Sequence, residues 1–271
     1  MTLLQIIVLA VVQGITEFLP ISSSGHLILV PALTDWPDQG IMMDVGVHVG
    51  TLMAVILYFR KDVGRMFHAF GQMLLLREDY NHSERHLMLA VVLSTIPIII
   101  IGGLASKFGI PDTMRTLEII GWASIIFGIL LYWYDKKSPV KIKMADIRYG
   151  HALIIGLAQV LSLIPGTSRS GITMTAARGL GFSRTCAARF SMLMSIPTIL
   201  AAATLQVINI ATSETELQIS IVQLLWGAGL SLISALIAIS VLMKWLERSS
   251  MTPFVIYRVL LGIGLLYLVY Q

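Results

Sequence analysis

The chain has 271 residues, of which 56% are hydrophobic and only 13% are charged. Soluble domains usually carry about 25% charged residues, so the composition excludes an ordinary soluble protein and indicates a chain surrounded mostly by lipid. The formal net charge is +4, but the basic residues lie in short segments between apolar stretches, which indicates membrane topology and not a nucleic-acid partner. The single cysteine, Cys186, excludes an internal disulfide and a multi-cysteine metal site.

Apolar stretches of about 20 residues, the length that crosses a bilayer as a helix, recur along the chain. Six of them predict membrane-spanning helices at residues 41–59, 86–106, 116–134, 187–209, 219–243 and 254–270. Between the first two spans, a short amphipathic helix is expected around Phe67–Leu76. Ten full crossings would be an alternative layout, but their segments would be too short.

Two further apolar stretches, residues 2–30 and 150–180, are interrupted by polar residues. We call these interruptions the first break (residues 20–26) and the second break (residues 165–171). Each half of either stretch has about 10–15 residues, too few to cross a bilayer. A polar break survives at membrane depth only when it is buried in protein or lines a wet cavity. We therefore expect each stretch to form a re-entrant helical hairpin.

The distribution of Lys and Arg predicts the orientation. Neither residue occurs before Arg60, and both are then concentrated in a few segments, chiefly residues 60–85 and 136–148. Basic segments remain on the cytoplasmic side of a membrane. With six spans and two re-entrant hairpins, every basic segment lies inside and both termini lie outside.

The order of these elements predicts an internal repeat within one membrane domain, residues 1–271. Residues 1–134 form one broken hairpin followed by three spans, and residues 150–270 do the same. Because three is odd, the second half enters from the opposite side of the membrane. The fold expected is an all-α integral membrane protein with an inverted-topology repeat, whose shared site lies near the midplane where the broken helices meet.

The first hairpin carries an ionisable residue, Glu17, inside an apolar stretch. Such a residue is costly in a membrane and is a functional candidate by default. Gln13 lies four residues earlier, on the same helical face. Backbone amides at the start of the helix after the break would form an anion site. The first break adds three hydroxyls, a glycine and an imidazole, from Ser22, Ser23, Ser24, Gly25 and His26.

The second break supplies a cation, Arg169, between Ser168 and Ser170 and close to Gly171. The planar guanidinium suits phosphate, and glycine lets a backbone approach an oxyanion closely. If the two hairpins meet, their combined groups suit phosphoryl transfer, in which cations and amides stabilise spreading charge while a base or nucleophile attacks.

Each of these side chains also has a structural interpretation. Glu17 would hydrogen-bond between helices or bind a cation in a transporter, and the serines would satisfy backbone groups. His26 would cap a helix. His48, near the start of a span, is expected to be structural or interfacial, and Arg258 is expected to extend toward the membrane interface.

Residues 13–26 read Gln-Gly-Ile-Thr-Glu-Phe-Leu-Pro-Ile-Ser-Ser-Ser-Gly-His, and residues 165–171 read Pro-Gly-Thr-Ser-Arg-Ser-Gly. Together these two segments resemble the signature motifs of the bacterial undecaprenyl-diphosphate phosphatase family of the bacitracin-resistance type. Length, the order of spans and residues 253–258 are also similar, so the resemblance covers essentially the whole chain.

The resemblance implies hydrolysis of undecaprenyl diphosphate, a polyprenyl lipid, to the monophosphate, which recycles the lipid carrier for cell-wall polymers. It also implies a bacterial inner membrane, a site open to the outer side, and a divalent cation, Mg²⁺ or Ca²⁺. The family's acidic motif falls on Gln13 and Glu17, its serine on Ser23, its histidine on His26 and its arginine on Arg169. Many members have glutamate where Gln13 stands, so one carboxylate of the metal site is lost here.

We expect Glu17 to hold the metal or act as a base, Ser23 or a water to attack, and His26 to activate the nucleophile or protonate the leaving oxygen. Arg169 and the hairpin amides would bind the diphosphate. Further diphosphate-binding residues are expected to be Ser22, Ser24, Gly25, Ser168, Ser170 and Gly171.

Two other functions fit the pattern. Inverted repeats with broken helices are also a transporter architecture, so a secondary transporter or flippase of polyprenyl phosphate lipids is the alternative. A non-catalytic scaffold would leave Glu17 and Arg169 unexplained. Gly227 and Gly229 would permit a homodimer, but small residues also serve contacts within one chain.

Overall fold

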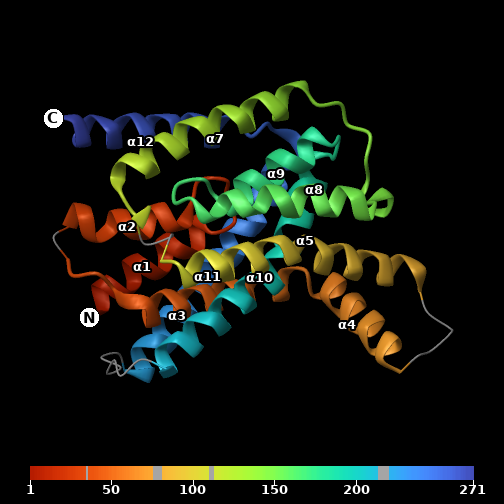
Figure 1. Ribbon diagram of the computed structural model, residues 1–271, viewed down its shortest axis with the longest axis horizontal. Helices are drawn as coiled ribbons and strands as arrows, with labels where there is room; N and C mark the ends of the chain where they lie inside the picture. Colours follow the sequence, from red (N-terminus) through yellow and green to blue (C-terminus); the bar gives the residue numbers. More distant parts are fainter. Residues whose placement is uncertain (35, 76–80, 110–112, 213–219) are drawn as a thin grey trace.

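The computed structural model describes residues 1–34, 36–75, 81–109, 113–212 and 220–271. Within these ranges the protein is helical, apart from one isolated parallel bridge between Ile142 and Phe182. The helices run mainly along one long axis, with both termini at one end and α4 (Arg60–Leu74) at the other (Figure 1).

Six helices are long and apolar enough to cross a membrane. They are α3 (Gly40–Tyr58), α5 (His82–Lys107), α7 (Leu117–Lys137), α10 (Arg184–Thr212), α11 (Ile221–Arg248) and α12 (Thr252–Tyr270). Each predicted span falls on one of them, although residue 219, the predicted start of the fifth span, lies outside the described residues. No more than 39% of any apolar window is buried inside the protein. The remaining apolar surface requires lipid, and the chain is a multi-pass membrane protein.

Four shorter helices form two pairs. They are α1 (Leu3–Thr16), α2 (Ser23–Thr34), α8 (Tyr149–Gln159) and α9 (Arg169–Gly179). Two short 3₁₀ turns, η1 (Met144–Asp146) and η2 (Val160–Leu163), precede and follow α8. The longest of the four short helices has 14 residues and extends about 21 Å at 1.5 Å per residue, less than the roughly 30 Å of a hydrocarbon core.

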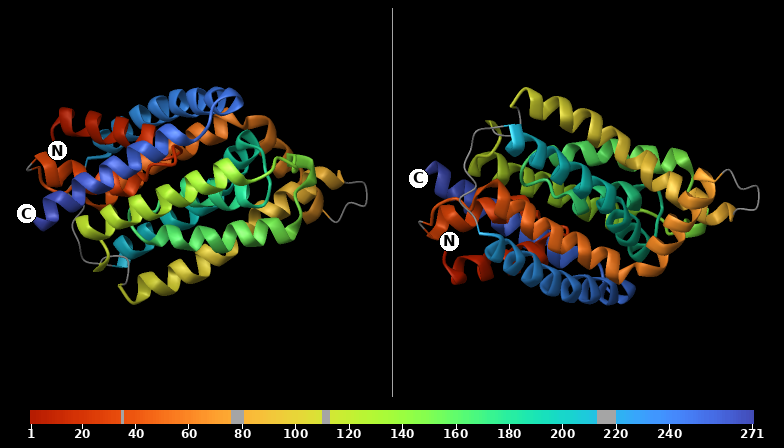
Figure 2. Two further views of the ribbon diagram at one scale, coloured as in Figure 1. Left: turned by 90° about the horizontal axis from the view of Figure 1, so that it is seen from above. Right: turned by 90° about the horizontal axis from the view of Figure 1, so that it is seen from below.

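The two ends of the molecule differ in charge. The loop that joins α7 to α8, which contains the basic segment 136–148, lies at the same end as α4, opposite the termini (Figures 1 and 2). Helix α4 is the amphipathic helix expected around Phe67–Leu76; it begins earlier than expected, and residue 76 lies outside the described residues. The basic segments 60–75 and 136–148 therefore gather at one end of the helices.

Small residues let α1 and α3 approach α11 closely. A Cβ atom added to Gly14 would lie 1.9 Å from Ser234 Oγ, and one added to Gly50 would lie 2.1 Å from the Ala228 carbonyl oxygen. Such close approach is typical of helix packing in membranes. At Gly227 an added Cβ would lie 2.9 Å from Met43 Sδ, so this glycine serves a contact within the chain, and the homodimer stays a prediction.

A buried carboxylate, Asp135 of α7, joins this helix to three others at the α4 end. Its Oδ1 accepts from Arg184 Nε at 2.7 Å and lies 3.3 Å from Arg178 Nε. The Met251 amide donates to its Oδ2 at 3.1 Å. A charge buried in a membrane protein is tolerated when it is paired, so Asp135 fixes the ends of α7, α9–α10 and α12 relative to one another.

Candidate active site

The first hairpin places Glu17 at the end of α1. The Glu17 amide continues the helix by donating to the Gln13 carbonyl at 2.9 Å. Its side chain, in a residue only 6% exposed, accepts two hydrogen bonds on Oε2: from Gln13 Nε2 at 3.0 Å and from Ser23 Oγ at 2.6 Å. The carboxylate is therefore held between the helical face of α1 and the start of α2.

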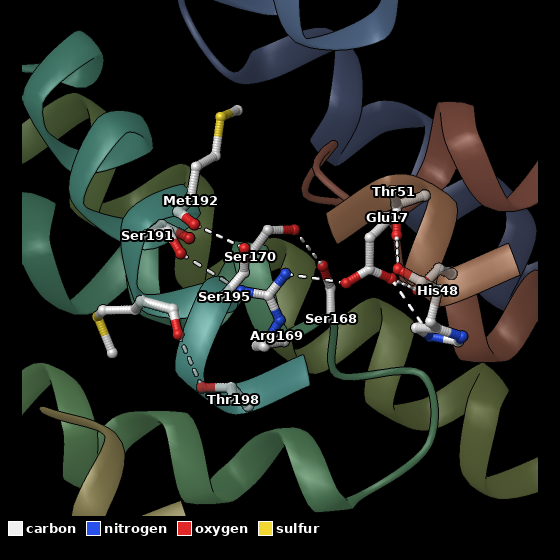
Figure 3. A network of polar contacts seen from close by, with 12 residues as sticks. Glu17, His48, Thr51, Ser168, Arg169, Ser170, Ser191, Met192, Ser195 and Thr198 are labelled. Carbon is white, nitrogen blue, oxygen red and sulfur yellow. Dashed lines mark hydrogen bonds and ion pairs between the residues drawn. The ribbon is translucent and has the colours of Figure 1, made fainter. Parts of the chain in front are cut away.

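The second hairpin brings Arg169 to the other oxygen of this carboxylate. Arg169 Nη2 donates to Glu17 Oε1 at 2.9 Å, and Nη1 donates to the Ser191 carbonyl at 3.3 Å. Figure 3 shows the guanidinium between Glu17 and α10. Residues 152 positions apart in the sequence thus form one ion pair, as expected from the idea that the two hairpins meet.

The two breaks share a backbone geometry. Ser22 and Ser168 are the non-glycine residues with positive φ in the described chain, at 73° and 70°. Each serine hydroxyl accepts from the amide three residues later: Gly25 N at 3.4 Å and Gly171 N at 3.1 Å. A non-glycine residue in this region costs about 1–3 kcal/mol and is usually found at functional sites. The strained serine turns the chain into a new helix at each break.

A cavity of about 330 Å³ opens beside the Glu17–Arg169 pair. This volume is at the lower end for ligand pockets. Both hairpins contribute to its wall, with Glu17, Ser22, Ser23, Ser24, Ser168 and Arg169. Other elements add Asp44, His48 and Arg115 together with apolar side chains such as Ile41, Val45 and Ile199.

His48, for which a structural or interfacial role was expected, lines this cavity beside Glu17. Its Nε2 lies 3.7 Å from Glu17 Oε2. Its Nδ1 lies 2.7 Å from the Asp44 carbonyl oxygen, which can only accept, so Nδ1 donates and Nε2 faces Glu17. The sequence signal was faint, because His48 lies on a separate helix with no polar cluster around it.

His26 is held away from the cavity. Its Nδ1 lies 2.7 Å from the Ser22 carbonyl oxygen and its Nε2 lies 2.5 Å from the Tyr257 hydroxyl. The two rings stack with centroids 5.6 Å apart. Among the described residues, Gly25, Ser170 and Gly171 also lie behind the cavity wall. Ser170 Oγ instead donates to the Leu19 carbonyl at 2.8 Å and ties the hairpins together.

Arg258 does not extend to the membrane interface, and that expectation is wrong. It has 0% exposure. One nitrogen, Nη2, donates to the carbonyls of Ala123, Gly166 and Thr167 at 3.3, 2.9 and 2.8 Å. Carbonyl oxygens of α7 and of the second break thus satisfy Nη2 inside the protein, whereas the buried Nε and Nη1 have no hydrogen-bond partner in the described chain.

Glu17, which lies outside the six long helices, is ionised in this environment. Burial raises the pKa of the carboxyl, but the charges of Arg169 and His48 and the hydrogen bonds from Ser23 and Arg169 outweigh it, so the pKa lies below its ordinary value of 4.5. A carboxylate paired with a guanidinium and accepting hydroxyl hydrogen bonds favours its charged form. At neutral pH the site therefore contains a preformed ion pair.

The residues of the site do not fit a divalent cation held by protein ligands alone. No group of three or more His, Cys, Asp or Glu side chains that would hold a metal ion occurs in the described ranges. Both Glu17 oxygens already accept hydrogen bonds. Gln13 replaces a second carboxylate and offers only Oε1, a buried oxygen with no hydrogen-bond partner in the described chain.

Comparison with known proteins gives a consistent family. The family model described as "Bacitracin resistance protein BacA" matches residues 6–264. The chain is 46% identical over 271 residues to the undecaprenyl-diphosphatase of Dinoroseobacter shibae, with 100% of both chains covered. It is 49% identical to undecaprenyl-diphosphatase 2 of Stutzerimonas stutzeri, covering 99% of this chain and 98% of the relative.

Both motifs that suggested the resemblance, residues 13–26 and 165–171, lie within the matched region. The match is not confined to them, since it runs through the six long helices as well. From this agreement over nearly its whole length, the chain belongs to the bacitracin resistance protein BacA family.

Proposed function

We propose that the chain hydrolyses undecaprenyl diphosphate to undecaprenyl phosphate and phosphate in the cavity between the two breaks. The activity itself follows from membership of a family whose full-length relatives are undecaprenyl-diphosphatases. The Glu17–Arg169 ion pair, with Ser23 hydrogen-bonded to the same carboxylate, is the observation that supports placing the reaction in this cavity. These relatives are named as diphosphatases and not as transporters, so we propose hydrolysis over lipid transport.

The diphosphate is bound by Arg169 and by the starts of two helices. Helix α2 begins at Ser23 and α9 begins at Arg169, and the first amides of a helix have no partner within it. Such helix starts bind anions. Ser22, Ser24 and Ser168 line the same wall and add hydroxyl donors.

Ser23 is the proposed nucleophile and Glu17 its base. Ser23 Oγ already donates to Glu17 Oε2 at 2.6 Å, a geometry in which the proton leaves as the oxygen attacks. The oxygen bonds to the terminal phosphorus, the bridging P–O bond breaks, and undecaprenyl phosphate leaves. Water then cleaves the phosphoserine, releasing phosphate and restoring the hydroxyl. Arg169 stabilises the charge that spreads over the phosphate oxygens.

His48 takes the proton-transfer role expected of His26. Its Nε2 faces both the cavity and Glu17, whereas both nitrogens of His26 contact other partners. The 3.7 Å separation exceeds a hydrogen bond, but catalytic contacts commonly tighten when substrate binds. His48 would return the proton collected by Glu17 to the leaving phosphate oxygen.

The substrate is proposed to be the Mg²⁺ or Ca²⁺ complex of the diphosphate. The cavity wall contains two carboxylates, Glu17 and Asp44, and two guanidinium groups, Arg169 and Arg115. These formal charges nearly cancel, so the wall has too little positive charge to neutralise a diphosphate. Mg²⁺ is usually bound by phosphate oxygens, water and one or two carboxylates. A cation that arrives with the diphosphate would neutralise part of its charge.

We also propose that α1–α2 and α8–α9 are re-entrant hairpins of an inverted repeat in a bacterial inner membrane. Their short lengths and the matched serines at positive φ support this proposal. The cavity also involves Ile41, Arg115 and Gln206, from the ends of elements near the termini (Figure 1). The basic segments lie at the opposite end, so by the positive-inside rule the cavity opens to the outer side and both termini lie outside.

Phosphate release from undecaprenyl diphosphate by detergent-purified protein tests the proposal. We expect release with Mg²⁺ and none with chelator, and Glu17→Gln or Arg169→Lys should reduce it by orders of magnitude. Glu118→Gln is the matched control, because Glu118 pairs with Tyr270 away from the cavity. Full turnover in folded Glu17→Gln or Arg169→Lys protein would place the reaction elsewhere.

A further inference from the structure

Two consecutive residues of α12, Tyr257 and Arg258, each contact one of the two breaks. Tyr257 reaches the first break through His26, and Arg258 reaches the second break through its carbonyls. Neither residue is among those that line the cavity. The pair is therefore placed behind both walls of the site at once.

Arg258 holds two consecutive carbonyls of the second break. Nη2 donates to Gly166 O at 2.9 Å and to Thr167 O at 2.8 Å. Gly166 has φ +90°, and a Cβ atom there would lie 2.6 Å from the Ile120 carbonyl oxygen. The segment is thus enclosed between α7 and Arg258. With its carbonyls fixed on this side, the chain turns at Ser168 and directs Arg169 toward Glu17.

Tyr257 contacts the first break through His26, from a partly exposed position on α12. Its residue is 42% exposed, and its hydroxyl lies 2.5 Å from His26 Nε2. His26 Nδ1 in turn contacts the carbonyl of Ser22 at 2.7 Å; a carbonyl only accepts, so Nδ1 carries the proton and Nε2 accepts from the Tyr257 hydroxyl. Lipid offers no competing hydrogen bonds, so this chain connects α12 to the strained serine just before Ser23.

We infer that Tyr257 and Arg258 are positioning residues for the phosphatase reaction. Together they fix the separation between the nucleophile of one break and the phosphate-binding arginine of the other. The inference rests on the proposed site at Glu17, Ser23 and Arg169. Misplacing a reacting group by about 1 Å can cost on the order of 100-fold in rate, so the pair should govern kcat without touching substrate.

The chain provides a matched control for each residue. Arg178 is also buried and donates to backbone carbonyls, those of Asp135, Ser138 and Phe182, but at the α4 end. Tyr270 lies on the same helix as Tyr257, and its hydroxyl donates to Glu118 Oε1 at 2.6 Å. Equivalent substitutions at these residues measure the cost of losing such contacts without moving the breaks.

The experiment compares Arg258→Lys with Arg178→Lys, and Tyr257→Phe with Tyr270→Phe, as full-length folded protein. The expected decrease in kcat is about 10- to 100-fold for Arg258→Lys and roughly 3- to 10-fold for Tyr257→Phe. KM should change by less than about 3-fold, because the binding groups remain present. The control variants should lower the thermal midpoint while keeping kcat per folded molecule.

A double-variant cycle isolates the Tyr257 contact. If Tyr257 acts through His26, adding Tyr257→Phe to a His26→Gln protein should cost little further kcat, since the two changes break one chain of contacts. Should Arg258→Lys fail to fold, Tyr257→Phe still tests the inference, because it removes a single oxygen from a partly exposed side chain.

Unchanged kcat in folded Tyr257→Phe and Arg258→Lys would overturn the inference, as would decreases no larger than those of the controls. Glu17→Gln and Arg169→Lys are measured in the same series. If those two variants keep full activity, the proposed site is wrong; if they are inactive while the α12 variants are not, only the positioning role is wrong.

Discussion

Ser23 and Arg169 occupy the same position in the two hairpins: each directly follows a serine with positive φ, and each is the first residue of its helix. One position carries a hydroxyl and the other a guanidinium. Both contact Glu17, on different oxygens. The two breaks thus contribute complementary groups to one site, each from the first residue of the helix that follows a serine with positive φ.

Ser23→Ala should reduce phosphate release by about 10³-fold or more, because the proposed nucleophile is lost. Rapid quenching of the wild-type enzyme should trap phosphoserine at Ser23. Ser240→Ala is the control, since in the described chain that hydroxyl donates within α11, to Leu236 O at 2.7 Å. Normal turnover of Ser23→Ala without any phosphoserine in the wild type would assign the attack to water.

Gln13→Glu should make the enzyme more dependent on divalent cation. The amide that now donates to Glu17 would become a second carboxylate beside the first, costing about 1–3 kcal/mol of stability without cation. With cation, two carboxylates would face the diphosphate complex. We expect the Mg²⁺ concentration for half-maximal activity to decrease several-fold; an unchanged Mg²⁺ titration would mean that this position does not face the cation.

His48→Gln should move the acidic limb of the kcat/KM profile to higher pH. The charge of His48 helps to keep the pKa of Glu17 below 4.5 against burial, so removing it raises that pKa. Protonated Glu17 neither pairs with Arg169 nor accepts the Ser23 proton, and activity is lost as pH falls through the raised pKa. His26→Gln, which alters no charge beside Glu17, should leave the position of this limb unchanged.

Asp135→Asn should destabilise the protein without altering its chemistry. Removing one partner of a buried ion pair costs about 3–5 kcal/mol, and here Arg178 and Arg184 would both lose theirs. The thermal midpoint in detergent should decrease clearly, while kcat per folded molecule stays near wild type. A loss of kcat at an unchanged midpoint would link Asp135 to catalysis.

The six long helices could be predicted because lipid imposes both length and apolarity on a spanning segment. Glu17 and Arg169 could be predicted because each is a charge in an apolar or glycine-rich setting, where ionisable residues are costly. Their direct contact agrees with the expectation that the breaks meet.

The burial of Arg258 and the position of His48 beside Glu17 could not be predicted, for one physical reason. Whether a polar side chain near the end of a span faces the interface or the interior depends on which acceptors the fold brings to it. The carbonyls that hold Arg258 come from residues 91 to 135 positions away, and Glu17 meets His48 from another helix. The periodicity of a sequence does not show which distant residues will contact a given side chain.

The long-range contacts of the first hairpin constrain how the protein is made. Glu17 meets its partner only after residue 169 has been synthesised, and His26 meets Tyr257 231 residues later. The first hairpin therefore completes these contacts only after α9 and then α12 have been synthesised. A chain truncated before α12 would keep the Glu17–Arg169 pair but lack the contact between His26 and Tyr257.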